Sequence, residues 1–202
     1  MKRISCIVEG HGEVSSLPLL LRRLAVWRSY TDWIDIERPI RVKRDRFLNR
    51  EEELRRFVLL AAEKSGPNGW ILILLDADDD CPVDLAKDLL KRAKTFLPNH
   101  RISAVIANRE YESWFIASAA SLDGARGLKI DATDLTIDPD TPRDAKGWIG
   151  RRMKGNSYGP TADQPALTQV MDLNSAYERS RSFRKLCAEW DLTFSKISDG
   201  AA

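Results

Sequence analysis

The chain has 202 residues, and 31% of them are charged, but 32 Lys and Arg against 30 Asp and Glu leave a formal net charge of only +2. Any attraction to nucleic acid must therefore come from local clusters of charge. Three widely spaced cysteines indicate neither a disulfide framework nor a structural zinc site, and no stretch has the roughly 20 apolar residues that span a bilayer, so we expect a cytoplasmic protein outside the membrane.

The first predicted elements are a buried strand and an amphipathic helix. Residues 4–8 are a nearly continuous apolar run, which is typical of a strand buried on both faces. We expect a helix to follow, capped by Ser15 or Ser16, with Pro18 in its first turn. Residues 35–42 alternate weakly in polarity, and this pattern predicts a second strand.

The alternation of strands and helices continues to about residue 107. Asn49 and Glu52 have the spacing of a capping box, which predicts the start of a second helix. The apolar run at 70–75 predicts a second buried strand, Pro82 a third helix, and residues 102–107 a further strand. This order predicts an α/β fold of the Rossmann-like kind, with a mostly parallel sheet flanked by helices.

The second half of the chain has a different composition. Glycine, aspartate and proline are interspersed over residues 122–165, which predicts irregular surface chain. Helical spacing returns over residues 167–190, with Phe183, Leu186, Cys187 and Trp190 expected to face inward. We therefore predict a core over residues 1–120 and an irregular and helical extension over 121–202 that packs on it as one structural unit.

Two acidic clusters directly follow the two most apolar strands. Glu9 comes after the first strand, and Asp76 and Asp78 come after the strand at 70–75. Ligands of open parallel sheets bind outside the carboxyl ends of the strands, and carboxylates that meet there raise one another's pKa values. Mg²⁺ or Mn²⁺ would remove that cost, so we predict these three residues as metal ligands. Candidates for a second ion, which would help to stabilise a phosphoryl displacement, are Glu13, Asp80 and Glu112.

The competing interpretation is that these carboxylates only cap helices or solvate loops. Glu13 in particular suits the first turn of a helix. Of Glu110 and Glu112, we expect one to reach the strand-end cavity and the other to point elsewhere. Trp114 and Phe115 fit a buried pair better than a platform for stacking bases.

Basic residues occur in two runs. Residues 41–56 hold seven Lys and Arg that would neutralise phosphates, but the interleaved acids at 51–53 make a solvated helix face an equally good interpretation. The second run lies in the glycine-rich segment beside Trp148. A flexible basic chain with an aromatic residue favours contact with nucleic acid. The residues predicted for that contact are Lys146, Arg151, Arg152 and Lys154.

The ordered acidic motifs carry a family resemblance. Glu9-Gly10 and Asp76-x-Asp78, each after an apolar strand, resemble a Toprim domain, the metal-binding module of topoisomerases, primases and overcoming-lysogenization-defect nucleases. Residues 9–13 and 108–115 are similar to the bacterial family called domain of unknown function 4276, and residues 158–164, 171–172 and 182–186 extend the resemblance over nearly the whole chain.

The resemblance implies roles for particular residues and for a partner. Glu9 would be the Toprim glutamate that acts as general acid/base or metal ligand, and Asp76 and Asp78 the metal-holding aspartates of a core over residues 1–120. Related Toprim families often occur with an ATPase, and this chain has no Gly-x-x-x-x-Gly-Lys-Ser/Thr loop of its own. No lysine in the strand segments is placed to stabilise a transition state, which leaves Arg109, Lys146 and Lys154 as candidates.

Three functional hypotheses follow. The first is a Mg²⁺- or Mn²⁺-dependent nuclease for DNA or RNA, acting as the effector of an ATPase-linked system of phage defence or genome maintenance. Its catalytic residues would be Glu9, Glu13, Asp76, Asp78 and Glu112. The second is a non-catalytic subunit that docks to a partner ATPase. The third is a phospho-receiver domain with Asp76 as acceptor, against which stand the further acids after Asp76 and the long extension. A homo-oligomer is compatible with each.

Overall fold

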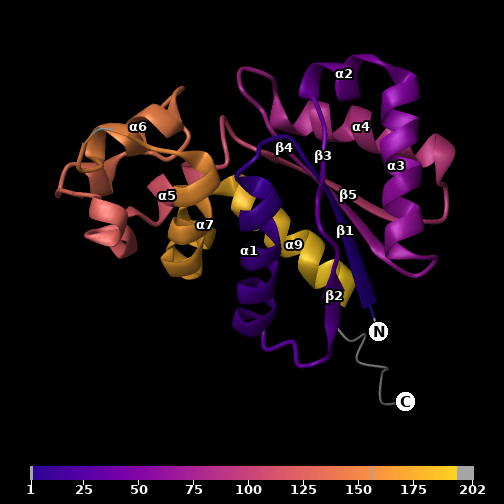
Figure 1. The fold of residues 1–202 in the computed structure, drawn as a ribbon, viewed down its shortest axis with the longest axis horizontal. Helices are drawn as coiled ribbons and strands as arrows, with labels where there is room; N and C mark the ends of the chain where they lie inside the picture. Colours follow the sequence, from indigo (N-terminus) through magenta and orange to yellow (C-terminus); the bar gives the residue numbers. More distant parts are fainter. Residues whose placement is uncertain (1, 156, 195–202) are drawn as a thin grey trace.

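The computed structural model describes residues 2–155 and 157–194. Five strands form one sheet: β1 (Lys2–Val8), β2 (Ile34–Ile36), β3 (Ile40–Arg41), β4 (Trp70–Asp76) and β5 (Arg101–Ala107). Their order is β2-β1-β4-β5, β3 also pairs with β1, and every pairing is parallel (Figure 1). The predicted α/β Rossmann-like fold is confirmed.

One face of the sheet is covered by the helices of the first half of the chain. These are α2 (Arg44–Asn49), α3 (Glu51–Ser65) and α4 (Pro82–Phe96). Successive side chains of a strand point to opposite faces, so Ile71, Ile73 and Leu75 of β4 join the apolar cluster on this side. Trp70, Leu72 and Leu74 of β4 join the cluster on the other. All seven residues of β4 are buried, as the unbroken apolar run predicts.

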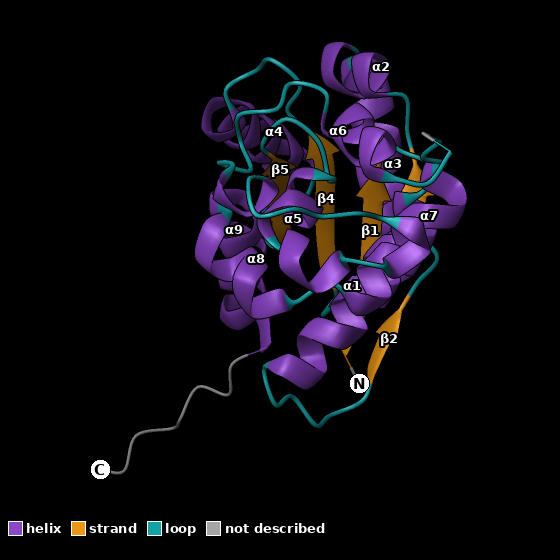
Figure 2. Cartoon of the chain, turned by 90° about the vertical axis from the view of Figure 1, so that its left-hand side faces the viewer, coloured by secondary structure: helices purple, strands orange, loops and turns teal. Residues whose placement is uncertain are grey.

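The opposite face carries α1 and the helices of the second half (Figure 2). A single apolar cluster extends from Ile4 in β1 to Phe194 at the end of the last helix. Both halves of the chain therefore share one core on this face, and the division near residue 120 stays a prediction. The helices are α1 (Glu13–Trp27), α5 (Ser113–Ala117), α6 (Ala145–Arg152), α7 (Pro160–Val170), α8 (Leu173–Arg179) and α9 (Arg181–Phe194).

The predicted second strand and two predicted helix starts need correction. The segment 35–42 contains two short strands, β2 and β3, which pair with β1 at different levels. Helix α1 begins at Glu13 because the Gly12 carbonyl accepts the amides of Ser15 and Ser16, at 3.0 and 2.9 Å. Pro18 therefore lies inside the helix.

The capping box was also a wrong prediction. Asn49 is the last residue of α2, and α3 begins at Glu51 after an extended Arg50. No side chain caps α3, because the Arg50 carbonyl accepts the amides of Glu53 and Leu54 instead.

The second half holds more helix than its composition predicts. Helix α6 and the start of α7 lie in the segment expected to be irregular. Short 3-10 turns precede α6, at Ala119–Leu122, Ala125–Gly127 and Asp134–Thr136. The helical stretch after residue 167 is divided among α7, α8 and α9, because Asp172 caps a new helix by accepting the Ser175 amide at 2.6 Å. The four residues predicted to face inward, Phe183, Leu186, Cys187 and Trp190, are buried.

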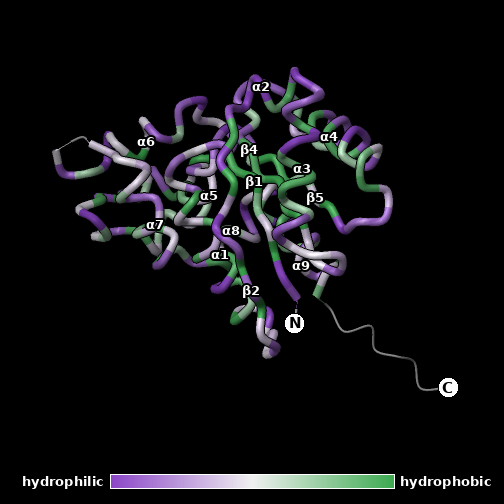
Figure 3. Tube along the Cα trace, turned by 45° about the vertical axis from the view of Figure 1, so that its right-hand side comes forward, coloured by the Kyte–Doolittle hydropathy of each residue, from purple (hydrophilic) through white to green (hydrophobic). Residues whose placement is uncertain are grey.

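Hydropathy follows this layering. The strands at the centre are hydrophobic and the outer loops are hydrophilic, as Figure 3 shows. Over the described part of the chain, each helix is too short or too polar to cross a membrane.

Candidate active site

The candidate site lies where the order of the strands reverses. From β1 the chain first adds β2 and β3 on one side, and then adds β4 and β5 on the other. The reversal therefore falls between β1 and β4, where ligands of open α/β sheets bind at the carboxyl ends of the strands. Glu9 follows β1, and Asp76 is the last residue of β4.

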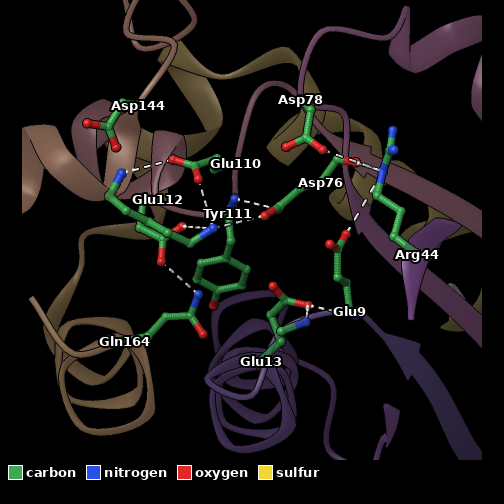
Figure 4. Close-up of polar contacts among 12 residues, drawn as sticks. Glu9, Glu13, Arg44, Asp76, Asp78, Glu110, Tyr111, Glu112, Asp144 and Gln164 are labelled. Carbon is green, nitrogen blue, oxygen red and sulfur yellow. Dashed lines mark hydrogen bonds and ion pairs between the residues drawn. The ribbon is translucent and has the colours of Figure 1, made fainter. Parts of the chain in front are cut away.

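Asp76 is fixed by two donors from later parts of the chain. It is only 6% exposed. Its Oδ1 accepts the Tyr111 amide at 2.8 Å, and its Oδ2 accepts a hydrogen bond from Lys146 Nζ at 3.2 Å (Figure 4). Burial raises the pKa of Asp76, against the opposing effects of Lys146 and of the Tyr111 amide.

Lys146 brings a cation into the cluster from the start of α6. Besides Asp76, its Nζ lies 2.9 Å from Glu110 Oε1 and 3.7 Å from Glu112 Oε2. Burial alone would lower the pKa of Lys146, but the carboxylates of Glu112, Asp76 and Glu110 outweigh it and raise that pKa. The ammonium group is therefore charged at neutral pH.

This arrangement corrects one expectation from the sequence and brings one of the three candidate cations, Lys146, beside Asp76. Glu110 and Glu112 both contact Lys146, so neither points elsewhere: α6 places Lys146 between them, and Glu110 Oε2 also accepts the Lys146 amide at 2.9 Å. The cation that the strand segments lack comes from the second half of the chain, 70 residues after Asp76.

Glu13 folds back over the first acidic loop. Its Oε2 accepts the amides of Glu9 and Gly10, both at 3.1 Å, and the residue is 2% exposed. Burial and the nearby Asp76 raise the pKa of Glu13 to about 8. A Cβ at Gly10 would lie 2.8 Å from Glu13 Oε1, so a larger residue here would make the Glu13 carboxyl group shift from its place over the loop.

Glu112 is completely buried and is held by residues of the second half of the chain. Its Oε1 accepts hydrogen bonds from Tyr158 Oη at 2.8 Å and from Gln164 Nε2 at 3.1 Å. Its Oε2 has no hydrogen-bond partner among the described residues. Burial, with a contribution from Asp76, raises the pKa of Glu112 to about 7.

Glu9 lies on the open side of the cluster. Burial, followed by the charges of Asp76 and Asp78, raises the pKa of Glu9 to about 7. Its Oε2 is buried without a hydrogen-bond partner in the described chain, and the nearest cation is Arg44 Nε at 4.0 Å. Asp78 faces outward with 59% of its side chain exposed and lies 3.7 Å from Arg44 Nε.

The two acids after Asp78 pair with arginines. Asp79 contacts Arg109 and Arg143, at 2.8 and 3.0 Å, and Asp80 pairs with Arg44. Asp80, a candidate ligand of a second ion, therefore shares Arg44 with Asp78.

The carboxylates fit a hard divalent cation in their chemistry. Their oxygens are the ligands that Mg²⁺ and Mn²⁺ prefer, and Glu9 Oε2 is a buried acceptor that no described donor reaches. Among the residues that the structure describes, no three His, Cys, Asp or Glu side chains are already gathered around one point at coordinating distance. The predicted ligands Glu9, Asp76 and Asp78 therefore do not form a ready-made metal site in the part of the chain that the structure describes.

The predicted nucleic-acid contacts separate into two places. Lys146 belongs to the acidic cluster, whereas Arg151, Arg152 and Lys154 line a cavity of about 730 Å³ together with Lys129, Asp131 and Asp134. Arg151 is five residues after Lys146 on α6, which is roughly 7.5 Å along a helix axis.

The expectation that this basic segment is flexible chain was wrong. This basic segment is largely the helix α6, and Trp148 is 4% exposed because it packs in the core. The Arg152 guanidinium stacks on its ring, 3.6 Å from the centroid, and also pairs with Asp134.

Sequence reasoning missed the residues that hold the cluster from the side of the extension. Tyr158 and Gln164 both donate to Glu112, and Ser16 Oγ lies 3.1 Å from Gln164 Oε1. Spacing gives no signal for contacts between residues so far apart. The one available signal was that both residues fall in the stretch 158–164, which carries the family resemblance.

Comparison with known proteins gives the family. No curated protein and no solved structure matches the chain. The model of one family, described as "Domain of unknown function (DUF4276)", matches residues 8–190. The matched region contains Glu9, Asp76, Glu112 and Lys146, and so includes the whole strand-end cluster. The chain belongs to the DUF4276 family.

Proposed function

We propose that this protein is a divalent-metal-dependent phosphodiesterase that cuts DNA or RNA. The observation that carries the proposal is a cluster of buried carboxyl groups around one lysine at the point where strand order reverses. In it, burial and mutual repulsion raise the pKa values of Glu9 and Glu112 to about 7 and that of Glu13 to about 8. Perturbed groups of this kind gather at sites of chemistry, because a purely structural role is better served by paired charges.

In this proposal Glu9, Asp76 and Asp78 hold Mg²⁺ or Mn²⁺. When bound, such a cation would polarise the phosphoryl group and lower the pKa of a water molecule. Glu9 has a pKa near 7 and an oxygen without a donor, and these properties suit it to accept a proton from the attacking water at neutral pH. Lys146 keeps its charge and would stabilise the negative charge that develops on the phosphate oxygens.

Glu13 and Glu112 have supporting roles in the proposed reaction. Glu13 holds the backbone of Glu9 through two amide hydrogen bonds and would thereby fix the direction of the Glu9 side chain. Glu112 is oriented by Tyr158 and Gln164, which leaves its other oxygen directed toward Lys146. That oxygen would orient the attacking water or help to hold a second ion.

The wider setting follows from the Toprim resemblance. We infer a relation to the overcoming-lysogenization-defect nucleases, with a separate ATPase as partner, a role in phage defence or genome maintenance, and action in the cytoplasm. Support comes from the order of the motifs, Glu9 after β1 and Asp76-x-Asp78 at the end of β4. A self-associated form is compatible with this setting.

One observation favours the alternative of a non-catalytic subunit. Lys146 already pairs with Asp76 and Glu110, so part of the cluster is neutralised without a metal ion. Such a protein would act by docking to its ATPase. The phospho-receiver hypothesis is disfavoured, because Asp76 is 6% exposed and both of its oxygens accept hydrogen bonds.

The test is cleavage by the Asp76→Asn variant. Wild-type protein should cut labelled DNA or RNA in Mg²⁺ or Mn²⁺, and the variant should fall to the background set by EDTA while it keeps its circular-dichroism spectrum and melting transition. Asp84→Asn is the matched control, since Asp84 lies exposed in the first turn of α4. Full cleavage by Asp76→Asn would reject the proposal. An inactive wild type, even together with its ATPase and Mn²⁺, would decide for the docking subunit.

A further inference from the structure

A cavity of about 630 Å³ opens between the first acidic loop and the segment that connects β3 with α2. One wall contains Glu9, His11 and Asp78, which belong to the strand ends of the candidate active site. The other wall is basic and contains Arg41, Lys43, Arg44 and Arg46. We call this cavity the basic groove.

The basic groove lies beside Glu9 because of the register between β1 and β3. Val8 pairs with Arg41, and the Val42 amide donates to the Val8 carbonyl at 2.8 Å. The two strands are parallel, so the residues after Arg41 leave the sheet at the same edge as Glu9. The chain then turns into α2, which begins at Arg44.

The four basic residues of the groove differ in their partners. Arg44 is half-buried and directed into the acidic cluster, with ion pairs to Glu9 and Asp78 (Figure 4) and a further ion pair to Asp80. Arg41, Lys43 and Arg46 are exposed, and none of them has an ion pair with a carboxylate in residues 2–155 or 157–194. The groove therefore has unpaired positive charge directly beside a site that is rich in carboxylates.

The acidic residues that weaken a nucleic-acid interpretation in the sequence lie outside the groove. Glu51 pairs with Arg92 on α4, and Glu52 and Glu53 are on α3 away from the lining. Asp45, in the first turn of α2, is the one further carboxylate of the lining. Among the described residues, the basic wall of the groove therefore contains three unpaired cations and one carboxylate, Asp45.

The chemistry of this lining matches a phosphate backbone. A polyanion that approaches Glu9 and Asp76 would be repelled by them, and flanking cations offset that repulsion. The lining residues include no aromatic side chain apart from the exposed imidazole of His11, so the groove offers no wide platform for stacking bases. Contact through phosphates alone does not depend on base sequence.

We propose that the basic groove binds the sugar-phosphate backbone of a nucleic-acid strand beside the active site, through Arg41, Lys43 and Arg46 and without regard to sequence. This inference rests on the proposed phosphodiesterase function for its biological meaning, but the binding itself does not require cleavage. The second basic cavity, at Arg151 and Lys154, lies at the end of α6, and α6 lies well apart from α2 in Figure 1.

The experiment measures binding by fluorescence anisotropy in EDTA, with all proteins in the Asp76→Asn background so that nothing is cut. The probe is a fluorescein-labelled single-stranded DNA oligonucleotide of mixed sequence, titrated at several salt concentrations. The test variant is Arg41→Gln/Lys43→Gln/Arg46→Gln. The matched control is Arg50→Gln/Arg55→Gln/Arg56→Gln, which removes the same charge from exposed positions outside the groove.

We expect the groove variant to bind at least tenfold more weakly at low salt. Each phosphate contact contributes about 0.7 to the slope of log K against log salt for single strands, so the slope should become shallower by about 2. A second oligonucleotide of different sequence should behave in the same way, and the control variant should stay close to the parent. Thermal melts of both variants check that the fold is kept.

Several results would overturn the proposal. Equal losses in both triple variants would mean general electrostatic attraction, and no loss in the groove variant would mean that the groove is not used. Vesicles of anionic lipid that displace the oligonucleotide and depend on the same three residues would mean a membrane surface instead. A selective loss in the groove variant supports the groove even if wild-type protein cuts nothing in Mn²⁺, and in that case only the phosphodiesterase proposal fails.

Discussion

The two ends of the sheet both bury glutamates, but they treat them differently. At the amino end of β5, Glu189 of α9 pairs with Arg101 at 2.7 Å and with Lys185 at 2.6 Å, and it also accepts the Ser103 hydroxyl. Burial would raise the pKa of Glu189, yet these partners lower it on balance. This end of the sheet shows that the chain can satisfy a buried carboxylate.

The carboxyl end leaves its acids under-compensated. There Glu9, Glu13 and Glu112 all have raised pKa values, and an oxygen of Glu9 and one of Glu112 lack a hydrogen-bond donor in the described chain. The difference teaches that these raised pKa values are a local feature of one end and do not follow from burial alone. Selection for stability alone would favour paired carboxylates such as that of Glu189. The unpaired carboxyl groups at the carboxyl end are therefore better explained by a role in catalysis.

Substitution of one lysine at each end of the sheet should give the largest difference, which is a difference in cleavage rate. Lys146→Gln should slow cleavage in single-turnover assays by about 10²–10³-fold, because it removes a preformed positive charge next to the reacting phosphate. Lys185→Gln is the matched control, since it breaks the ion pair with Glu189 at the far end. It should leave the cleavage rate unchanged. Equal rates for wild type and Lys146→Gln would remove Lys146 from the reaction.

Exchange of a glutamate at each end tests stability. Glu189→Gln leaves Arg101 and Lys185 without their carboxylate and should lower the free energy of unfolding by about 1–2 kcal/mol, after allowance for the half-exposed cations. Glu112→Gln keeps an acceptor for Tyr158 and removes a charge near Asp76, so stability should stay equal or rise. Urea unfolding at pH 7.5 measures both variants. Similar losses in the two would erase the contrast between the ends of the sheet.

The sequence predicts one side of this site well. Apolar runs fix β1 and β4, and the acids that follow them must then meet at one edge of a parallel sheet, so Glu9 and Asp76 are found without coordinates. Lys146 could not be placed, because its contact with Asp76 depends on how α6 packs over a separation of 70 residues. The same reason hides Tyr158 and Gln164. The weak alternation over 35–42 predicts one strand there and gives no signal for the break between β2 and β3.

The smallest expected difference between the two ends of the sheet is in how the free energy of unfolding depends on pH. Folding raises the pKa from the ordinary glutamate value of 4.5 to about 7 for Glu112 and to about 8 for Glu13. Between the ordinary and the raised values, each of these groups binds more protons in the folded protein than in the unfolded chain. Stability from these groups is fully present below pH 4.5 and is lost as the pH rises through 7 to 8. Glu189, whose pKa is lowered, has the opposite sign and contributes stability above the ordinary glutamate pKa.

Urea unfolding in EDTA from pH 5.5 to 8.5 should therefore show a free energy of unfolding that falls with pH, by about 1–3 kcal/mol for a group such as Glu112. Glu112→Gln should flatten the decline and Glu189→Gln should leave it intact. If the cluster takes a divalent ion, Mn²⁺ should restore stability mainly above pH 7, where the carboxylates are ionised and free to bind it. A pH profile that rises, or that Glu112→Gln does not alter, would mean that the carboxyl end is as well compensated as the amino end.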